Sequence, residues 1–239
     1  MPPDVLDDFV ARERRSDDAA LLAAASGREY DYRRFCTSAW KVGNFLSQLG
    51  VRAGTTVAVA PELAPEPVLA FYGAATLGAT VRFDPPADTD ARAVVVPTAE
   101  MTDYDLPPGS TLVVYGSPPD SPAVSYFERD VWSQNPTQPP DRVTPEETLL
   151  ATGTDAYTHR AVLAAARAAV ESLSLSATDR VAVRAPLTAP GAVAAGLVAP
   201  ILAGGEIVLP DGDGIWDAAV ATDPDTAPEG RVLDPATLL

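Results

Sequence analysis

The chain has 239 residues, 33 of them acidic against 17 basic, and its formal net charge at neutral pH is −16. Apolar residues make up 46% and charged residues 21%, so the chain can bury a sizeable core and wholesale disorder is excluded. An acidic surface repels phosphate backbones and anionic lipids, which argues against nucleic acid or a membrane as a partner.

Residue usage favours a protein of a salt-rich cytoplasm. Arg outnumbers Lys sixteen to one, and Asp outnumbers Glu 22 to 11. Many hydrated carboxylates with almost no lysine are expected of a halophilic protein, in which salt screens the repulsion between like charges. The first fifteen residues carry several charges and no apolar core, so we predict no signal peptide and expect a cytoplasmic protein.

Two residue counts exclude large classes of site. Cys36 is the only cysteine, which excludes disulfides within the chain, CxxC redox chemistry and thiolate zinc sites. His159 is the only histidine, which removes metal sites built from several imidazoles. We therefore assign no metal ligands and no catalytic residues from the sequence.

The first part of the chain predicts strands that alternate with helices. An apolar run and a Ser-Gly turn predict a short hairpin over 19–32. Asp31 is expected to cap a helix over 33–49, which Gly50 ends. A buried strand, a helix and another strand follow, at 57–60, 66–77 and 80–83. Helices joined to strands by short loops imply parallel βαβ crossovers.

The second part of the chain is interrupted by proline. Strands are predicted at 94–96 and 112–115, and residues 116–145 are expected to form a long irregular connection. Regular structure resumes at 147–153. The uncharged segment 185–205 contains prolines, glycines and alanines but few large aliphatic residues, so it predicts a buried helix flanked by loops rather than a membrane span.

The sequence contains an internal repeat. Both copies follow a helix, from Arg33 and from His159, and both contain a strand, a proline-containing loop, an apolar helix, a glycine and a strand. The matching apolar positions are Leu46 and Val170, Leu49 and Leu173, Val57 and Val181, Val59 and Val183, and, after a two-residue slip, Val81 and Ile207, Phe83 and Leu209. Duplication of one α/β unit is our interpretation, and chance similarity between two common α/β patterns is the alternative.

Duplication predicts two α/β subdomains packed about a pseudo-twofold axis. We expect the first at residues 1–90, a β-rich and proline-rich connection that completes the sheets at 91–145, and the second, with C-terminal strands, at 146–239. In such folds, ligands bind in the crevice at the carboxyl ends of the parallel strands.

The segment Thr152-Gly153-Thr154 is the candidate phosphate site. It follows a predicted strand and leads within a few residues into a helix, where glycine permits close backbone approach and a helix N-terminus favours an anion. An ordinary polar turn is the alternative, since neither Lys nor Arg lies within the segment. His159, at the start of that helix, is either part of the site or a capping and packing residue.

The order of these segments resembles that of the AMP-forming adenylating enzymes, which include acyl-CoA synthetases, luciferases and the adenylation domains of peptide synthetases. Residues 30–85 are similar to their N-terminal stretch, in which a "Y-x-E-L" helix, "L-G-V-x-x-G-D-x-V-A" and "A-x-x-x-x-G-A" occur in this order. The second half resembles the stretch that follows, and the resemblance covers roughly residues 20–210. The matching segments there are Thr152-Gly153-Thr154 at the phosphate loop, Thr158-His159-Arg160, Asp179-Arg180-Val181, Pro186-Leu187 and Gly204-Gly205.

The resemblance implies a fold and a set of ligands. The fold would be that of the N-terminal domain of acyl-CoA synthetases, with two pseudo-symmetric α/β subdomains and mainly parallel sheets. Such enzymes join a carboxylate to AMP, release pyrophosphate and usually pass the acyl group to a thiol. The family implies ATP or AMP with Mg²⁺ as ligands. It implies a nucleotide- or phosphate-binding role for Thr152, Gly153, Thr154 and His159.

The cationic groups of the family's active site have no counterpart in this sequence. The family's phosphate loop is a longer Ser-Gly-Thr-Thr-Gly-x-Pro-Lys type, and here the part with the lysine is missing. Lys41, the only lysine, belongs to an early helix. We also expect this chain to lack the adenine-binding and acyl-pocket segments and the C-terminal domain of the family. Loss of one preorganised donor alone costs ~3–4 kcal/mol of transition-state stabilisation.

Three functions follow as hypotheses. The first is a truncated pseudoenzyme without independent adenylation activity, which acts as a binding or interaction module for a separate chain, a second copy of itself or an acyl-adenylate-like ligand. The second is a component of an AMP-forming acyl- or acetyl-CoA synthetase whose remaining parts lie on another chain. The third is a nucleotide or anion binder that uses Thr152–Thr154.

Overall fold

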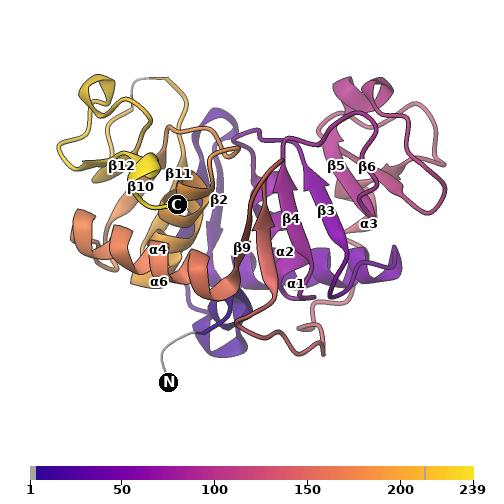
Figure 1. Ribbon diagram of the computed structural model, residues 1–239, viewed down its shortest axis with the longest axis horizontal. Coiled ribbons are helices and arrows are strands. Elements are labelled where there is room, and N and C mark those ends of the chain that lie inside the picture. The colour runs from indigo at the N-terminus through magenta and orange to yellow at the C-terminus, as the bar shows by residue number, and fades with distance from the viewer. Residues whose placement is uncertain (1–3, 213) are drawn as a thin grey trace.

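The computed structural model describes residues 4–212 and 214–239, which form two β-sheets with helices packed against them (Figure 1). The seven-stranded sheet has the order β7-β6-β5-β3-β4-β8-β9, and the six-stranded sheet has the order β13-β12-β10-β11-β1-β2. The strands of the first sheet are β3 (Thr56–Val59), β4 (Thr80–Phe83), β5 (Ala93–Pro97), β6 (Thr111–Tyr115), β7 (Ser125–Tyr126), β8 (Thr148–Ala151) and β9 (Ala156–Thr158). Those of the second are β1 (Ala19–Ala23), β2 (Arg28–Asp31), β10 (Arg180–Val183), β11 (Glu206–Leu209), β12 (Ala218–Val220) and β13 (Val232–Leu233).

Helices lie in several of the connections between these strands. They are α1 (Tyr32–Gln48), α2 (Pro65–Ala75), α3 (Phe127–Asp130), α4 (His159–Leu173), α5 (Pro190–Ala192), the π-helical η5 (Val193–Val198) and α6 (Ala199–Ala203). Short 3₁₀ turns are η1 (Leu6–Val10), η2 (Arg12–Arg14), η3 (Ala24–Ser26), η4 (Thr98–Asp103), η6 (Pro224–Thr226) and η7 (Pro235–Thr237). None of the helices in the described chain has the length and apolar character needed to cross a bilayer.

The predicted elements of the first part are confirmed. The predicted hairpin is β1–β2, and the Asp31 carboxylate caps α1 by accepting the Arg34 N–H at 2.6 Å. Gly50 takes the left-handed conformation (φ 86°) that ends this helix. Every strand pair is parallel except β1–β2 and β8–β9, so the prediction of mainly parallel sheets is also confirmed.

Two segments of the second part differ from the predictions. The connection 116–145 is not wholly irregular, because the buried Phe127 and Val131 hold β7 and α3 beside β6. The helix predicted within 185–205 is interrupted by the wider turns of η5. Pro200 has no N–H to donate to the preceding turn, which accounts for the change of helix type beside it.

The two sheets repeat one topology, which supports the predicted duplication. Strands β6-β5-β3-β4-β8-β9 correspond in order to β13-β12-β10-β11-β1-β2, and the helix before β3 corresponds to the helix before β10. Both helices begin with a side-chain cap. Asp31 caps α1, and Thr158 caps α4 by accepting the Ala161 N–H at 3.2 Å.

Each half of the chain contributes a hairpin to the sheet of the other half. β1–β2 lies beside β11, where Leu21 pairs with Ile207, and β8–β9 lies beside β4, where Leu150 pairs with Val81. The two halves are therefore interlocked at the centre of the molecule, where β2 and β9 are seen in Figure 1.

The predicted ranges 1–90, 91–145 and 146–239 stay a prediction, and within them each hairpin pairs with a strand of the other half. Local sequence patterns specify a hairpin, but the strand that it joins depends on the tertiary arrangement. Residues 1–3 and Asp213, which belong to the predicted ranges, lie outside the described residues.

Side chains also join the two sheets. One hydrophobic cluster extends through both of them, and the Tyr72 hydroxyl of α2 donates to the Leu197 carbonyl of η5 at 2.8 Å. Arg28 of β2 forms a two-pronged ion pair with Glu66 of α2, with N–O distances of 2.5 and 3.0 Å. Glu66 is 3% exposed, so this pair connects a strand of the six-stranded sheet to a buried charge beside the other sheet.

The 3₁₀ segment η1 packs across both halves of the chain. The Leu6 N–H donates to His159 Nδ1 at the start of α4 (3.0 Å), and the Val10 carbonyl accepts from Trp40 Nε1 of α1 (2.9 Å). His159 is fully buried, and its Nε2 has no hydrogen-bond partner among the described residues. Burial lowers the pKa of His159 to about 4.

The buried imidazole predicts a direct titration result. We expect the His159 Cε1–H resonance of the folded protein to keep the shift of the neutral ring down to pH about 5, and to titrate near 6.5 in urea. The unfolded chain thus takes up the His159 proton at a higher pH than the folded chain does. As pH falls from 6.5 towards 4, this proton uptake favours the unfolded chain and lowers the free energy of unfolding. A folded-state midpoint near 6.5 would contradict the buried packing role.

The exchanged hairpins predict how fragments behave. Cleavage between the exposed Asp141 and Arg142 separates a fragment with β1 to β7 from one with β8 to β13. Neither fragment holds a complete sheet, so we expect each alone to lack a dispersed amide NMR spectrum and an equimolar mixture to recover it. The uncleaved chain, refolded in the same way, is the control. A fragment that folds cooperatively alone would show that the exchange is dispensable.

Candidate functional site

The predicted phosphate segment Thr152–Thr154 forms the tip of the β8–β9 hairpin. β8 ends at Ala151 and pairs antiparallel with β9, so the chain turns back along the sheet before any helix begins. Gly153 and Thr154 are exposed at this tip. Helix α4 starts only after β9, with its own cap at Thr158. The segment therefore lies at a hairpin turn rather than at the N-terminus of a helix.

Most hydrogen-bonding groups of this tip are satisfied within it. The Thr152 N–H donates to the Asp155 carbonyl (2.8 Å), and the N–H groups of Thr154 and Asp155 donate to Thr152 Oγ1 (3.3 and 3.0 Å). Three of the four backbone donors of residues 152–155 are thus occupied. The Thr154 hydroxyl donates to the Asp155 carboxylate (2.5 Å). A phosphate at the tip would have to displace these bonds and would meet the negative charge of Asp155.

Arg82 supplies positive charge near the tip. A Cβ atom placed on Gly153 would lie 3.9 Å from Arg82 Nη2, and Arg82 Nε is buried without a hydrogen-bond partner among the described residues. Arg160, the cation close to the tip in sequence, is paired with Glu146. Arg82 could not be predicted from the sequence as a neighbour of the tip, because it belongs to β4 and reaches the tip only through the pairing of β4 with β8.

The structure does not bring His159 to the hairpin tip. In the register of the hairpin, Thr158 pairs with Thr148, at the opposite end from the tip. His159 is buried there and accepts the Leu6 N–H. This geometry supports the packing alternative for His159. The nucleotide-binding role of Thr152, Gly153, Thr154 and His159 stays a prediction.

The carboxyl end of the seven-stranded sheet, where α/β folds bind ligands, carries acidic side chains. Glu62 follows β3 and accepts the hydroxyl of Tyr115, which ends β6, at 2.6 Å. Burial and the hydrogen bond to Glu62 raise the pKa of Tyr115. Glu128 accepts the Gly116 N–H at 2.8 Å, and burial raises the pKa of this carboxyl. Carboxylates at this edge disfavour a polyanion such as ATP.

The described residues of the same edge provide few free oxygen ligands for Mg²⁺, which binds through several of them. Within residues 4–212 and 214–239, no three His, Cys, Asp or Glu side chains gather as a metal site. The acidic residues named above are instead bonded one by one to protein donors. The residues present therefore do not fit a resident Mg²⁺ ion, and we derive no reaction step through one.

The fold is shared with several solved structures. The anthranilate CoA ligase AuaEII, solved with anthranoyl-AMP, superimposes with a TM-score of 0.77 at 22% identity over 90% of this chain. The N-terminal domain of FACL13 from Mycobacterium tuberculosis gives 0.75 at 17% identity over 91%, and the nonribosomal peptide synthetase FmoA3 gives 0.71 at 22% over 87%. No protein-family model and no curated protein matches the sequence.

This chain matches only part of the length of each of these proteins. The chain spans 49% of the AuaEII structure, 62% of the FACL13 domain and 24% of FmoA3. The superposition covers 90% of this chain, so the shared fold extends over parts of both sheets. This chain has the α/β fold of the N-terminal domain of the AMP-forming adenylating enzymes, as the sequence resemblance implied.

Proposed function

We propose that this chain, by itself, is a binding or interaction module with the fold of an adenylating enzyme and does not catalyse adenylation. The observation that supports the proposal is the hairpin tip at residues 152–155, where backbone and hydroxyl donors bond to one another. Adenylation builds negative charge on the α-phosphate, and free donors or cations must be in place to stabilise it.

The energetic deficit is large enough to abolish turnover. Each preorganised donor that is lost costs ~3–4 kcal/mol, and the tip engages several donors internally. Asp155 adds a negative charge at this tip, where its carboxylate accepts the Thr154 hydroxyl. The only lysine, Lys41, lies in α1, where its Nζ donates to the Trp132 carbonyl at 2.9 Å.

The ligand class that the fold favours is an acyl-adenylate. The AuaEII structure holds anthranoyl-AMP, and one FmoA3 structure holds α-methyl-L-serine-AMP. An acyl-adenylate carries one phosphate charge and ATP carries several, so the acidic sheet edge at Glu62 and Glu128 repels ATP more strongly. We propose such a ligand, or a protein partner, for this edge. The partner would be a separate chain or a second copy, in a salt-rich cytoplasm.

A second candidate function is a component of an AMP-forming acyl-CoA synthetase that another chain completes. This candidate is favoured by the greater length of the solved proteins, since this chain matches 49% of AuaEII and 24% of FmoA3. The cations and the nucleotide pocket would then be supplied by the other chain. Nucleotide or anion binding by Thr152–Thr154 alone is the weakest candidate, because the donors of that tip are engaged.

Pyrophosphate release by the pure protein tests the proposal. With ATP, Mg²⁺, CoA and a panel of carboxylic acids in molar potassium chloride, we expect no release above a blank without protein. A known AMP-forming ligase, assayed at the same salt, is the positive control. Steady acid-dependent release by this chain alone would contradict the proposal. Release that requires a second chain would establish the second candidate instead.

A further inference from the structure

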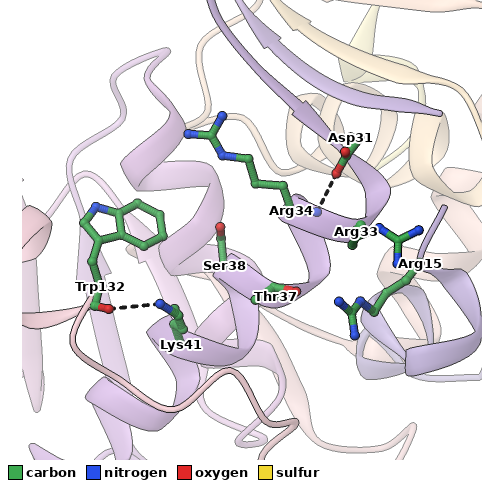
Figure 2. A pocket seen from close by; sticks show the side chains of 8 residues that line it. All are labelled: Arg15, Asp31, Arg33, Arg34, Thr37, Ser38, Lys41 and Trp132. Carbon is green, nitrogen blue, oxygen red and sulfur yellow. Dashed lines mark hydrogen bonds between the residues drawn. The ribbon is translucent and has the colours of Figure 1, made fainter. Parts of the chain in front are cut away.

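A pocket on the surface of α1 gathers positive charge in an otherwise acidic protein. Its volume is about 390 Å³, and four of the residues that line it are Arg15, Arg33, Arg34 and Lys41. Figure 2 shows Arg15 and Arg33 on one side and Trp132 on the other, with helix α1 between them. Four cations around one cavity contrast with the net charge of −16 of the whole chain.

Three of these cations have no carboxylate partner. Among the described residues, Arg15, Arg34 and Lys41 form no ion pair, whereas Arg33 pairs with the exposed Asp17. The carboxylate that lines the pocket, Asp31, accepts the Arg34 backbone N–H as the cap of α1. The pocket therefore holds an excess of positive charge that the protein does not neutralise locally.

Arg15 stacks on an aromatic ring at one side of the pocket. Its guanidinium carbon lies 5.4 Å from the ring centroid of Trp40, and its Nε is buried without a hydrogen-bond partner among the described residues. That buried Nε is closed to a ligand, so Arg15 contributes to the pocket through its positive charge and the rest of its guanidinium group.

The opposite wall of the pocket is held in place. Lys41 Nζ donates to the Trp132 carbonyl at 2.9 Å and lies 5.7 Å from the centroid of its ring. Asn44, one turn further along α1, donates to the carbonyls of Asn135 and Thr137 at 3.1 and 2.7 Å. These bonds fix the segment that carries Trp132 to α1, and the indole stays 36% exposed. The pocket thus has a preorganised aromatic wall.

We propose that this pocket binds a small molecule that carries a phosphate group and a planar ring. Arginine guanidinium groups match phosphate oxygens in geometry and charge, and the exposed indole of Trp132 offers a face on which a ring can stack. The volume falls within the usual range of small-molecule sites. The proposal does not rest on the proposed function, because no residue that lines the pocket belongs to the hairpin tip at 152–155.

Calorimetry on the full chain tests the pocket with AMP, inorganic phosphate and adenosine. We expect AMP to bind, phosphate to bind at least threefold more weakly, and adenosine to give no heat, with affinity falling from low salt to molar potassium chloride. Arg34→Gln and Arg15→Gln are each expected to weaken AMP binding at least tenfold. Trp132→Leu is expected to reduce the affinity for AMP to that for phosphate.

The matched control is Arg82→Gln, which removes the cation beside the hairpin tip and leaves the pocket intact. AMP binding that survives Arg82→Gln and is lost in Arg34→Gln supports the pocket. The reverse result would overturn the pocket and place AMP at the tip, against the basis of the proposed function. Absence of heat with AMP and phosphate at both salt concentrations would overturn the proposal that the pocket binds a phosphate compound and would leave the proposed function unaffected. Arg34 is exposed, so its variant stays informative if Arg15→Gln fails to fold.

Discussion

The exchange of hairpins between the two sheets is the constraint on which the rest of the structure depends. Each sheet ends in a hairpin from the other half of the chain, with β1 beside β11 and β8 beside β4. The hairpins cover strand edges that would otherwise be unpaired. They also place Arg28 next to Glu66 and the tip of β8–β9 next to Arg82, so the polar contacts between the halves follow from the exchange.

The chemistry of the molecule is divided between two surfaces. The carboxyl end of the seven-stranded sheet, where the fold leads one to expect a ligand, carries Glu62, Glu128 and a hairpin tip bonded to itself. A cluster of positive charge lies along α1, around Arg15 and Lys41, and Arg82 adds a single cation beside the hairpin tip. The fold of the N-terminal domain of an adenylating enzyme is thus present with acidic side chains at the edge where such folds bind ligands.

The sequence predicted what depends on local pattern. The capping carboxylate of Asp31 and Gly50 at the end of α1 act within a few residues, and the structure contains them where they were expected. The repeat was visible because the same local pattern occurs in both halves of the chain. The sequence could not predict which sheet each hairpin joins, because the pairing of Leu21 with Ile207 joins distant parts of the chain. The sequence also could not predict that Thr152 Oγ1 accepts backbone N–H groups within the turn, since the same residues in another type of turn would leave the hydroxyl free. The α1 pocket needs Trp132 from the proline-rich connection, whose path no local pattern specifies.

Unfolding followed at two tryptophans tests the interlocked fold most directly. Trp40 reports on α1 and Trp216 on the segment before β12, so variants that keep only one of them observe the two halves separately. If the exchanged hairpins make one cooperative unit, the fluorescence transition of each variant coincides with its loss of far-ultraviolet circular dichroism in urea. A fluorescence transition at Trp216 that is complete at a urea concentration where much of the dichroism remains would contradict the account.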